Sequence, residues 1–275
     1  MKNRAGAKRR AGQSPGIVHR DLHPARLLDL CTTSRLARTV VLFDSIGSTN
    51  LAAMEAGSAG APEGMLFISE EQRLGRGRKG REWLSVRGKS LTFSLLLRPV
   101  RRDEGLTAIM ALSAVTALGA RAVHPRIKWP NDVFLGGKKV GGILAEAKGD
   151  AVVIGMGLNV NERPEDFPAA IADEAVSLRM ACGRELDRGR VLCRIIEAFE
   201  RLYERFEREG FASFRAEIEE KLLYVGGSVT VETGDEKVRG KLLGITDEGH
   251  IRIAAAGGER VFASGELTVR GRIRG

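Results

Sequence analysis

The stretch GRGRKGREWLSVRGKSLTFSLLL, residues 75–97, decides between two classes of fold. Gly75, Gly77 and Gly80 satisfy the pattern G-x-G-x-x-G, which marks a dinucleotide site only where a strand enters it directly and a helix opens from it. The preceding predicted strand ends at Ser69, five residues separate it from the pattern, and the residues after the pattern predict another strand. The sequence therefore argues against a Rossmann fold.

The elements predicted on either side of this stretch mix strands and helices without regular alternation. Such an order favours an α+β fold, a mixed β-sheet flanked by helices, over a doubly wound one. Short apolar runs between turn residues predict the strands Thr39–Phe43, Met65–Ser69, Ser90–Leu97, Arg126–Trp129, Val133–Leu135, Lys138–Glu146 and Ala151–Val160. Helical spacing and capping residues predict helices at Leu106–Val123, Arg188–Glu209, Phe211–Leu223 and in the stretch LAAMEA, residues 51–56, after the possible caps Ser48, Thr49 and Asn50.

The pattern changes after Val225, where five short β-rich runs are separated by turn clusters such as TGDEK and TDEG. This texture predicts a small closed barrel appended to the main domain. We therefore expect three regions: a basic, disordered extension over residues 1–35, a main domain over 36–223 and the barrel over 224–275.

The charge of the chain is concentrated at its start. The net charge is +9, but the first 20 residues hold six lysines and arginines and no acidic residue, which leaves +3 for the rest. A nucleic-acid-binding module would instead carry its charge on one face, interleaved with aromatic residues, which make up only 5% here. The composition therefore argues for a solvated basic tail.

The cysteines and apolar runs indicate the cellular compartment of the protein and whether it spans a membrane. Three widely spaced cysteines and four scattered histidines form no CxxC pair and no cluster with metal-ligand spacing. We therefore expect a reduced, cytoplasmic protein without structural zinc or disulfides. The longest apolar stretch, residues 109–120, is too short to span a membrane.

The basic loop of residues 75–83 has two interpretations. A run holding Arg76, Arg78, Lys79 and Arg81 is usually a solvated surface. The alternative is a flexible clamp over a small anionic ligand, because glycine loosens the backbone and arginine can donate two parallel hydrogen bonds to a phosphate or carboxylate. This stretch alone leaves both interpretations open.

The stretch KWPND, residues 128–132, favours the second interpretation. Pro130 forces Trp129 into an extended conformation. Lys128 and Asp132 are therefore expected on either side of a sharp bend, although a plain surface turn would be about as common for such a pentapeptide.

The stretch GGKKVGGILAE, residues 136–146, begins with a tight turn and continues as a strand. Strand alternation predicts Lys139, Gly141 and Ile143 on one face. The lysine would then project over a residue that has no side chain.

The stretch GMGLNVN, residues 155–161, is predicted to place Gly155, Gly157 and Asn159 on one face of a strand. Glycines weaken a strand, so a face of them indicates a ligand or backbone in close approach. Tight helix–sheet packing is the alternative, but it would not explain Asn159.

Together these stretches resemble the biotin protein ligase family. The motifs STN (48–50), QRLGRGRKGREW (72–83), KWPND, KVGGILAE (139–146) and GMGLNVN occur in the family's order and approximate spacing, over roughly residues 36–270. The resemblance implies a mixed sheet related to class II aminoacyl-tRNA synthetases and an SH3-like C-terminal barrel. It also implies a two-step reaction, in which biotin and MgATP give biotinyl-5′-AMP and a lysine of a biotin carboxyl carrier protein then accepts the biotinyl group.

The resemblance further implies the roles of individual residues. The biotin-binding residues would be Ser48, Thr49, Asn50, Gln72, Arg76, Gly77, Arg78 and Lys139. The ATP and adenylate residues would be Arg78, Arg81, Trp83, Lys128, Asn131, Asp132 and Asn159. Catalysis would rest on Lys139, Arg76 and Arg78, with Asp132 as a ligand of Mg²⁺.

Two further expectations follow from comparison with this family. Bifunctional members carry an N-terminal winged helix-turn-helix, which does not fit the short basic segment before residue 36, so we expect a ligase-only form without specific DNA binding. A lipoyl or octanoyl transferase of the same broad fold is the nearest rival, but octanoyl transfer through a thioester needs a pocket cysteine. None of the cysteines lies in or beside the motifs. Homodimer formation stays open.

Overall fold

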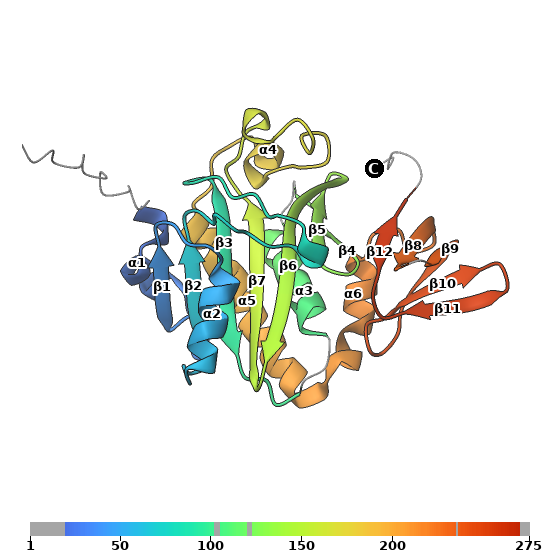
Figure 1. The fold of residues 1–275 in the computed structure, drawn as a ribbon, viewed down its shortest axis with the longest axis horizontal. Helices are drawn as coiled ribbons and strands as arrows, with labels where there is room; N and C mark the ends of the chain where they lie inside the picture. Colours follow the sequence, from blue (N-terminus) through green and yellow to red (C-terminus); the bar gives the residue numbers. More distant parts are fainter. Residues whose placement is uncertain (1–19, 102–104, 120–122, 235, 270–275) are drawn as a thin grey trace, which may run out of the picture.

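Strands between residues 39 and 159 form one seven-stranded sheet (Figure 1). This computed structural model describes residues 20–101, 105–119, 123–234 and 236–269. β1 and β2 pair in parallel and the other neighbours pair antiparallel, which confirms the predicted mixed sheet. In the order β1-β2-β3-β7-β6-β5-β4, the strands are β1 Thr39–Phe43, β2 Met65–Ser69, β3 Ser90–Leu97, β7 Ala151–Asn159, β6 Lys138–Lys148, β5 Asp132–Leu135 and β4 Arg126–Lys128.

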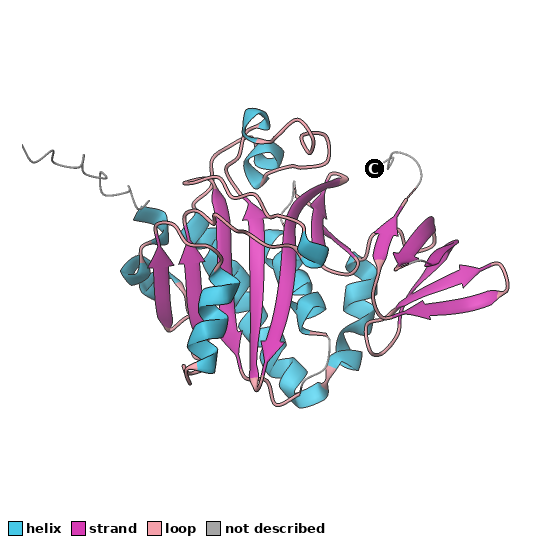
Figure 2. Cartoon of the chain, in the orientation of Figure 1, coloured by secondary structure: helices cyan, strands magenta, loops and turns pink. Residues whose placement is uncertain are grey.

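Helices cover both faces of this sheet (Figures 1 and 2). α2 (Thr49–Ser58) lies in front of it, and α3 (Leu106–Leu118) and α5 (Arg188–Glu209) pack on each other behind it. The main apolar core lies between the sheet and α3 and α5, and a smaller cluster that includes Phe67 lies beneath α2. β3 is buried at every position because both of its faces are covered, which accounts for its continuous apolar run.

Two predicted helices differ from the observed ones. α3 ends at Leu118, with Gly119 as its C-cap, because glycine is a poor helix residue. The helix predicted over 211–223 is a 3₁₀ turn, Phe211–Phe214, followed by the short α6, Arg215–Lys221. Neither change moves a residue of the motifs.

A β-bulge in β6 changes which residue Lys139 faces. The pairing of β6 with β5 skips Val140, so this strand carries one extra residue. The predicted alternation of Lys139, Gly141 and Ile143 on one face is therefore wrong. A Cβ atom built on Gly142 would lie 3.3 Å from the Lys139 Nζ atom, so Lys139 projects over Gly142 instead.

Residues 20–35 are folded onto the main domain, which corrects the expectation of a disordered extension over residues 1–35. Helix α1 (Pro24–Leu30) packs against α5 and β1, and Leu22 before it is fully buried. The apolar residues that make this contact follow directly on the basic segment, so composition averaged over both conceals them. Residues 1–19 lie outside the described residues.

A disulfide joins Cys31 to Cys193, which contradicts the expectation of a chain without disulfides. Cys31 caps the C-terminus of α1 and Cys193 lies in α5, so the bond fastens the N-terminal segment to the long helix. The two cysteines are 162 residues apart, so their pairing depends on the tertiary fold rather than on any local pattern.

A second, antiparallel sheet follows α6 and confirms the predicted SH3-like unit of five strands. Its order is β11-β10-β9-β8-β12, so β11 and β12 are its two ends. No helix in the described part of the chain is long and apolar enough to cross a membrane. The strands are β8 Ser228–Thr233, β9 Glu236–Ile245, β10 Ile251–Ala255, β11 Gly258–Phe262 and β12 Glu266–Thr268.

Candidate functional site

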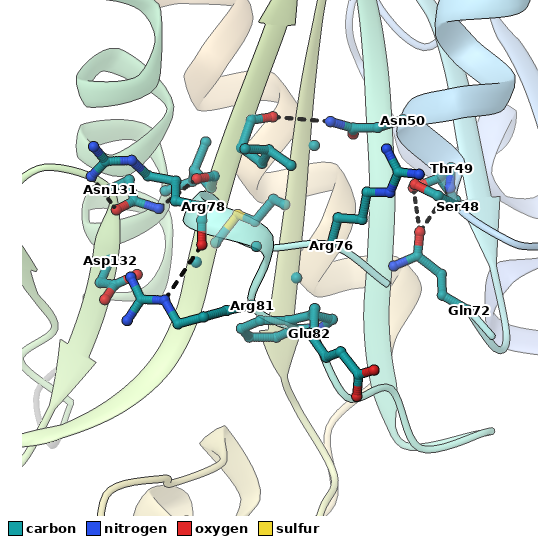
Figure 3. Close-up of a pocket in the computed structure, with 18 of the residues that line it drawn as sticks. Ser48, Thr49, Asn50, Gln72, Arg76, Arg78, Arg81, Glu82, Asn131 and Asp132 are labelled. Carbon is teal, nitrogen blue, oxygen red and sulfur yellow. Dashed lines mark hydrogen bonds between the residues drawn. The ribbon is translucent and has the colours of Figure 1, made fainter. Parts of the chain in front are cut away.

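A cavity of about 110 Å³ lies over β3, β7 and β6, beside the first turn of α2 (Figure 3). The segment between β2 and β3, residues 70–89 and here called the β2–β3 loop, covers it. The cavity brings together most of the residues predicted from the motifs: Ser48, Thr49, Asn50, Gln72, Arg76, Gly77, Arg78, Arg81, Trp83, Asn131, Asp132 and Lys139.

Two glycines of the predicted face of β7, Gly155 and Gly157, form part of the cavity floor. A Cβ atom on Gly155 would lie 2.0 Å from the Asn50 Oδ1 atom, and one on Gly157 would lie 2.1 Å from the Trp83 ring. Close approach is therefore the reason for these glycines. The approaching groups in this structure are two side chains of the site itself.

The first turn of α2 forms the polar side of the cavity. Ser48 is the N-cap of α2, and the backbone N–H of Thr49 donates to the Gln72 Oε1 atom at 2.7 Å. The Thr49 hydroxyl lies 3.0 Å from the same oxygen. Gln72 thus satisfies one of the N–H groups that a helix start leaves without a partner. This contact ties the β2–β3 loop to α2.

Asn50 is held by two residues that the sequence analysis missed. Its Nδ2 atom donates to the Glu146 carboxylate at 2.8 Å and to the Leu144 carbonyl at 3.2 Å, and its Oδ1 atom accepts from the Ser94 hydroxyl at 2.6 Å. Ser94 was detectable as a polar residue inside the apolar run of β3. Glu146 is the last residue of the motif KVGGILAE, but no role was expected for it, since a charged residue near a strand end is usually solvated.

Arg78 and Arg81 of the β2–β3 loop lie on the opposite side of the cavity, near Asn131 and Asp132, whereas Arg76 points toward Thr49 and Ser48 (Figure 3). Arg78 is part of a 3₁₀ turn, Arg78–Gly80, and its Nη1 atom lies 3.4 Å from the Asn131 Oδ1 atom. Burial lowers the pKa of Arg78, and the Asp132 carboxylate works against this shift. Arg81 pairs at 2.7 Å with Glu266 of β12, so the C-terminal sheet borders the loop.

Lys139 lies between the cavity floor and the aromatic wall. Its Nζ atom is 2.7 Å from the Asp132 Oδ1 atom and 5.7 Å from the centre of the Trp83 ring. The backbone of Lys139 also pairs with Glu174 and Val176, which fixes the strand on its outer side. The ammonium group is thus held in place while its side chain stays partly open to the cavity.

Two predicted residues do not line the cavity. The Lys128 Nζ atom lies 4.9 Å from the centre of the Phe134 ring, and burial lowers the pKa of Lys128, against the attraction of Asp132. Asn159 is buried and donates from its Nδ2 atom to the Val176 carbonyl at 3.1 Å. Lys128 therefore adds positive potential near Asp132, whereas Asn159 holds the segment after β7.

A buried arginine fixes both ends of the β2–β3 loop. Arg188, fully buried, donates to the Glu70 carboxylate at 2.8 and 2.9 Å and to the Ser90 carbonyl at 3.1 Å. Glu70 in turn accepts from the Gly88 N–H at 3.2 Å, and Asp21 pairs with the outer side of Arg188 at 2.8 Å. This network has no signal in the sequence, because its members are far apart in the chain.

The cavity offers too few protein oxygen atoms to bind a magnesium ion without phosphate from a substrate. In the described part of the chain, no three His, Cys, Asp or Glu side chains lie together as a metal site. Asp132 offers one carboxylate, and Asn131 beside it an amide oxygen, at the cationic side of the cavity. Mg²⁺ is commonly held by one or two carboxylates together with substrate phosphates and water, so this donor set suits it.

Comparison with known protein families identifies the class of protein to which the chain is similar. Residues 42–161 match the biotin/lipoate A/B protein ligase family, and residues 224–275 match the biotin protein ligase C-terminal domain. The bifunctional ligase/repressor BirA of Bacillus subtilis is 34% identical over 244 residues, covering 86% of this chain and 75% of that protein. The biotin–[acetyl-CoA-carboxylase] ligase of Paracoccus denitrificans is 32% identical, covering 80% and 96%.

Solved structures agree with this class. The biotin protein ligase from Aquifex aeolicus, in complex with biotin and ATP, matches with a TM-score of 0.76 and 32% identity, covering 84% of this chain and 98% of that one. The chain belongs to the biotin protein ligase family.

Proposed function

We propose that this protein activates biotin with ATP to biotinyl-5′-AMP and transfers the biotinyl group to a lysine of a biotin carboxyl carrier protein. The observation that carries the proposal is the division of one cavity into two sides. Thr49, Asn50 and Gln72 offer neutral hydrogen-bonding groups on one side, and Arg78 and Lys139 offer cations on the other. Biotin has the same division, with a cyclic urea at one end and a carboxylate at the other.

The first step needs charge neutralised more than it needs covalent help. A biotin carboxylate oxygen attacks the α-phosphorus of ATP, a P–O bond forms, and the bond to the leaving pyrophosphate breaks. Lys139 stands over Gly142, which has no side chain to fill the space where a carboxylate and a phosphate can meet. Arg78 and Lys128 add positive charge around the phosphate oxygens.

In the second step the carrier lysine amine attacks the biotinyl carbonyl, an amide bond forms, and AMP leaves with the electrons of the broken C–O bond. The β2–β3 loop excludes water from the mixed anhydride until then. Mg²⁺, where bound, would neutralise phosphate charge, with Asp132 and Asn131 as its protein donors. The cytoplasmic location expected from the sequence now rests on ATP as a substrate, because the Cys31–Cys193 disulfide removes the argument from reduced cysteines.

The lipoyl or octanoyl transferase alternative has less support. In the described residues the disulfide occupies two cysteines, and the third, Cys182, does not line the cavity. An acyl-thioester route therefore has no nucleophile there.

The test is incubation of the purified chain with labelled biotin, ATP, Mg²⁺ and a carrier domain. We expect ATP-dependent label on one carrier lysine and biotin-dependent exchange of pyrophosphate into ATP. Octanoate or lipoate should not replace biotin. Label on the carrier from either acid, with none from biotin, would overturn the proposal.

A further inference from the structure

We propose that Glu146 is a positioning residue for biotin recognition: it fixes the orientation of the Asn50 amide and, through Ser94, the direction in which the Thr49 hydroxyl points. The proposal rests on the proposed function for its ligand. Glu146 lies in β6, outside the residues that line the cavity, and acts on the site only through Asn50.

The Asn50 amide has no hydrogen left for a ligand. Both N–H groups of its amide are engaged, one at the Glu146 carboxylate and one at the Leu144 carbonyl. Its Oδ1 atom lies over Gly155 and accepts from Ser94, which leaves one lone pair. In this orientation Asn50 can only accept from a ligand.

The hydroxyl groups of Ser94 and Thr49 take part in three short oxygen–oxygen contacts. The Ser94 oxygen lies 2.6 Å from Asn50 Oδ1 and 2.7 Å from Thr49 Oγ1, and Thr49 Oγ1 lies 3.0 Å from Gln72 Oε1. Two hydroxyls supply two protons for these three contacts. The two shorter contacts take them, so Thr49 donates to Ser94 and Ser94 donates to Asn50. The Gln72 oxygen still receives the Thr49 backbone N–H.

The chain of donors therefore starts at Thr49 and ends at Glu146. It leaves acceptor lone pairs on Thr49 and Asn50, which line the cavity, and it leaves the Gln72 Nε2 group as a donor. A cyclic urea has two N–H donors and one carbonyl acceptor, which suits two acceptors and one donor. A reversed chain would present the wrong groups to the urea.

Glu146 decides the direction of this chain, because a carboxylate can only accept. A flipped Asn50 amide would bring its oxygen against the Glu146 carboxylate, which is strongly unfavourable. Glutamine at this position could donate to the flipped oxygen and would remove the preference. Alanine would remove one partner, but the Leu144 carbonyl would continue to hold the Asn50 N–H.

Glutamine at position 146 should therefore impair biotin binding more than alanine does. A residue that mattered only for packing would give the opposite order, because alanine removes more of the side chain. We expect Glu146→Gln to raise the KM for biotin about tenfold, because it allows the Asn50 amide to flip. Glu146→Ala should raise it about threefold, because it removes one charged hydrogen bond but leaves the amide held by Leu144. The KM for ATP, kcat and the melting temperature should stay close to the parent values in both. Lys148→Gln, two residues further along the exposed end of β6, is the matched control and should leave all four quantities unchanged.

A double-mutant cycle with Asn50→Ala completes the test. Glu146→Gln should have no further effect on the biotin KM once Asn50 is absent. An equal effect in both backgrounds, or a larger effect of Ala than of Gln at position 146, would overturn the inference. If the parent chain forms no biotinyl-5′-AMP, the proposed function fails; if it does and Glu146→Gln leaves the biotin KM unchanged, only this inference fails.

Discussion

Lys139 is the cation best placed to act on the reacting groups. It lies over Gly142 and beside Asp132, and its side chain is about one-third exposed, so the core does not depend on it. We expect Lys139→Ala to lower the rate of biotin-dependent ATP–pyrophosphate exchange by at least about 100-fold, since preorganised charge is worth this much in active sites. The melting temperature should change little.

The neighbouring Lys138→Ala is the control for this prediction, because Lys138 lies at the turn into β6 and does not line the cavity. It should exchange pyrophosphate like the parent. Full exchange activity in Lys139→Ala would remove this residue from the first chemical step.

Glu162 predicts a pH dependence of stability. Its carboxyl is buried, one of its oxygens has no hydrogen-bond partner among the described residues, and burial raises its pKa above the ordinary 4.5, although the Ser90 hydroxyl opposes this. The folded chain thus holds this proton more tightly than the unfolded chain. The stability that this gives is complete below pH 4.5 and is lost as the pH rises through the folded pKa.

Glu162→Gln should remove that loss, because an amide does not titrate. We expect the variant to melt at a higher temperature than the parent at pH 7 and the two to converge near pH 4. Thermal unfolding between pH 4 and pH 8 measures this. Parallel curves for the two proteins would show that Glu162 does not titrate abnormally.

At the scale of elements, the β2–β3 loop is fixed at its ends and free to move only between them. Arg188 holds Glu70 and Ser90, so any closure must occur in the residues around Arg73–Trp83. This part carries five trypsin sites. We expect trypsin to cut the ligand-free chain here first, and we expect biotin with ATP to slow the cut more than ATP alone, because the intermediate lies beneath the loop.

The control for this experiment is cleavage of the same chain with ATP and a biotin analogue that lacks the carboxylate. It should protect less than biotin does. Equal cleavage rates under all conditions, at concentrations that support turnover, would make the loop a solvated basic surface.

The elements that the sequence predicted correctly are those with a local cause. β3 has a continuous apolar run and α5 has a clear amphipathic pattern. The glycines of β7 indicated that another group lies close to the strand, and the side chains of Asn50 and Trp83 do so. The bulge at Val140 was not predictable, because both registers of β6 satisfy the same short-range pattern. Arg188 and Glu146 act through partners 118 and 96 residues away, which no local pattern encodes.

At the scale of the whole molecule, the N-terminal segment divides at residue 20. We expect deletion of residues 1–19 to leave biotinylation and the melting temperature unchanged. Deletion of residues 1–30 should destabilise the fold by about 3–5 kcal/mol, because it leaves one side of the buried Arg188 without Asp21 and exposes the core beneath Leu27. Chemical denaturation of the two truncated chains measures the difference, and equal stabilities would contradict it.

The two tryptophans of the chain stand at two different places. Trp83 lies over the bare floor at Gly157, and Trp129 donates from its indole to the Gly249 carbonyl, at the join with the C-terminal sheet. A Trp129→Phe chain, excited at a wavelength that tyrosine does not absorb, would therefore emit fluorescence from the cavity alone. The wavelength and polarisation of that light would follow each encounter with a ligand in real time, so the protein carries its own optical sensor and needs no dye.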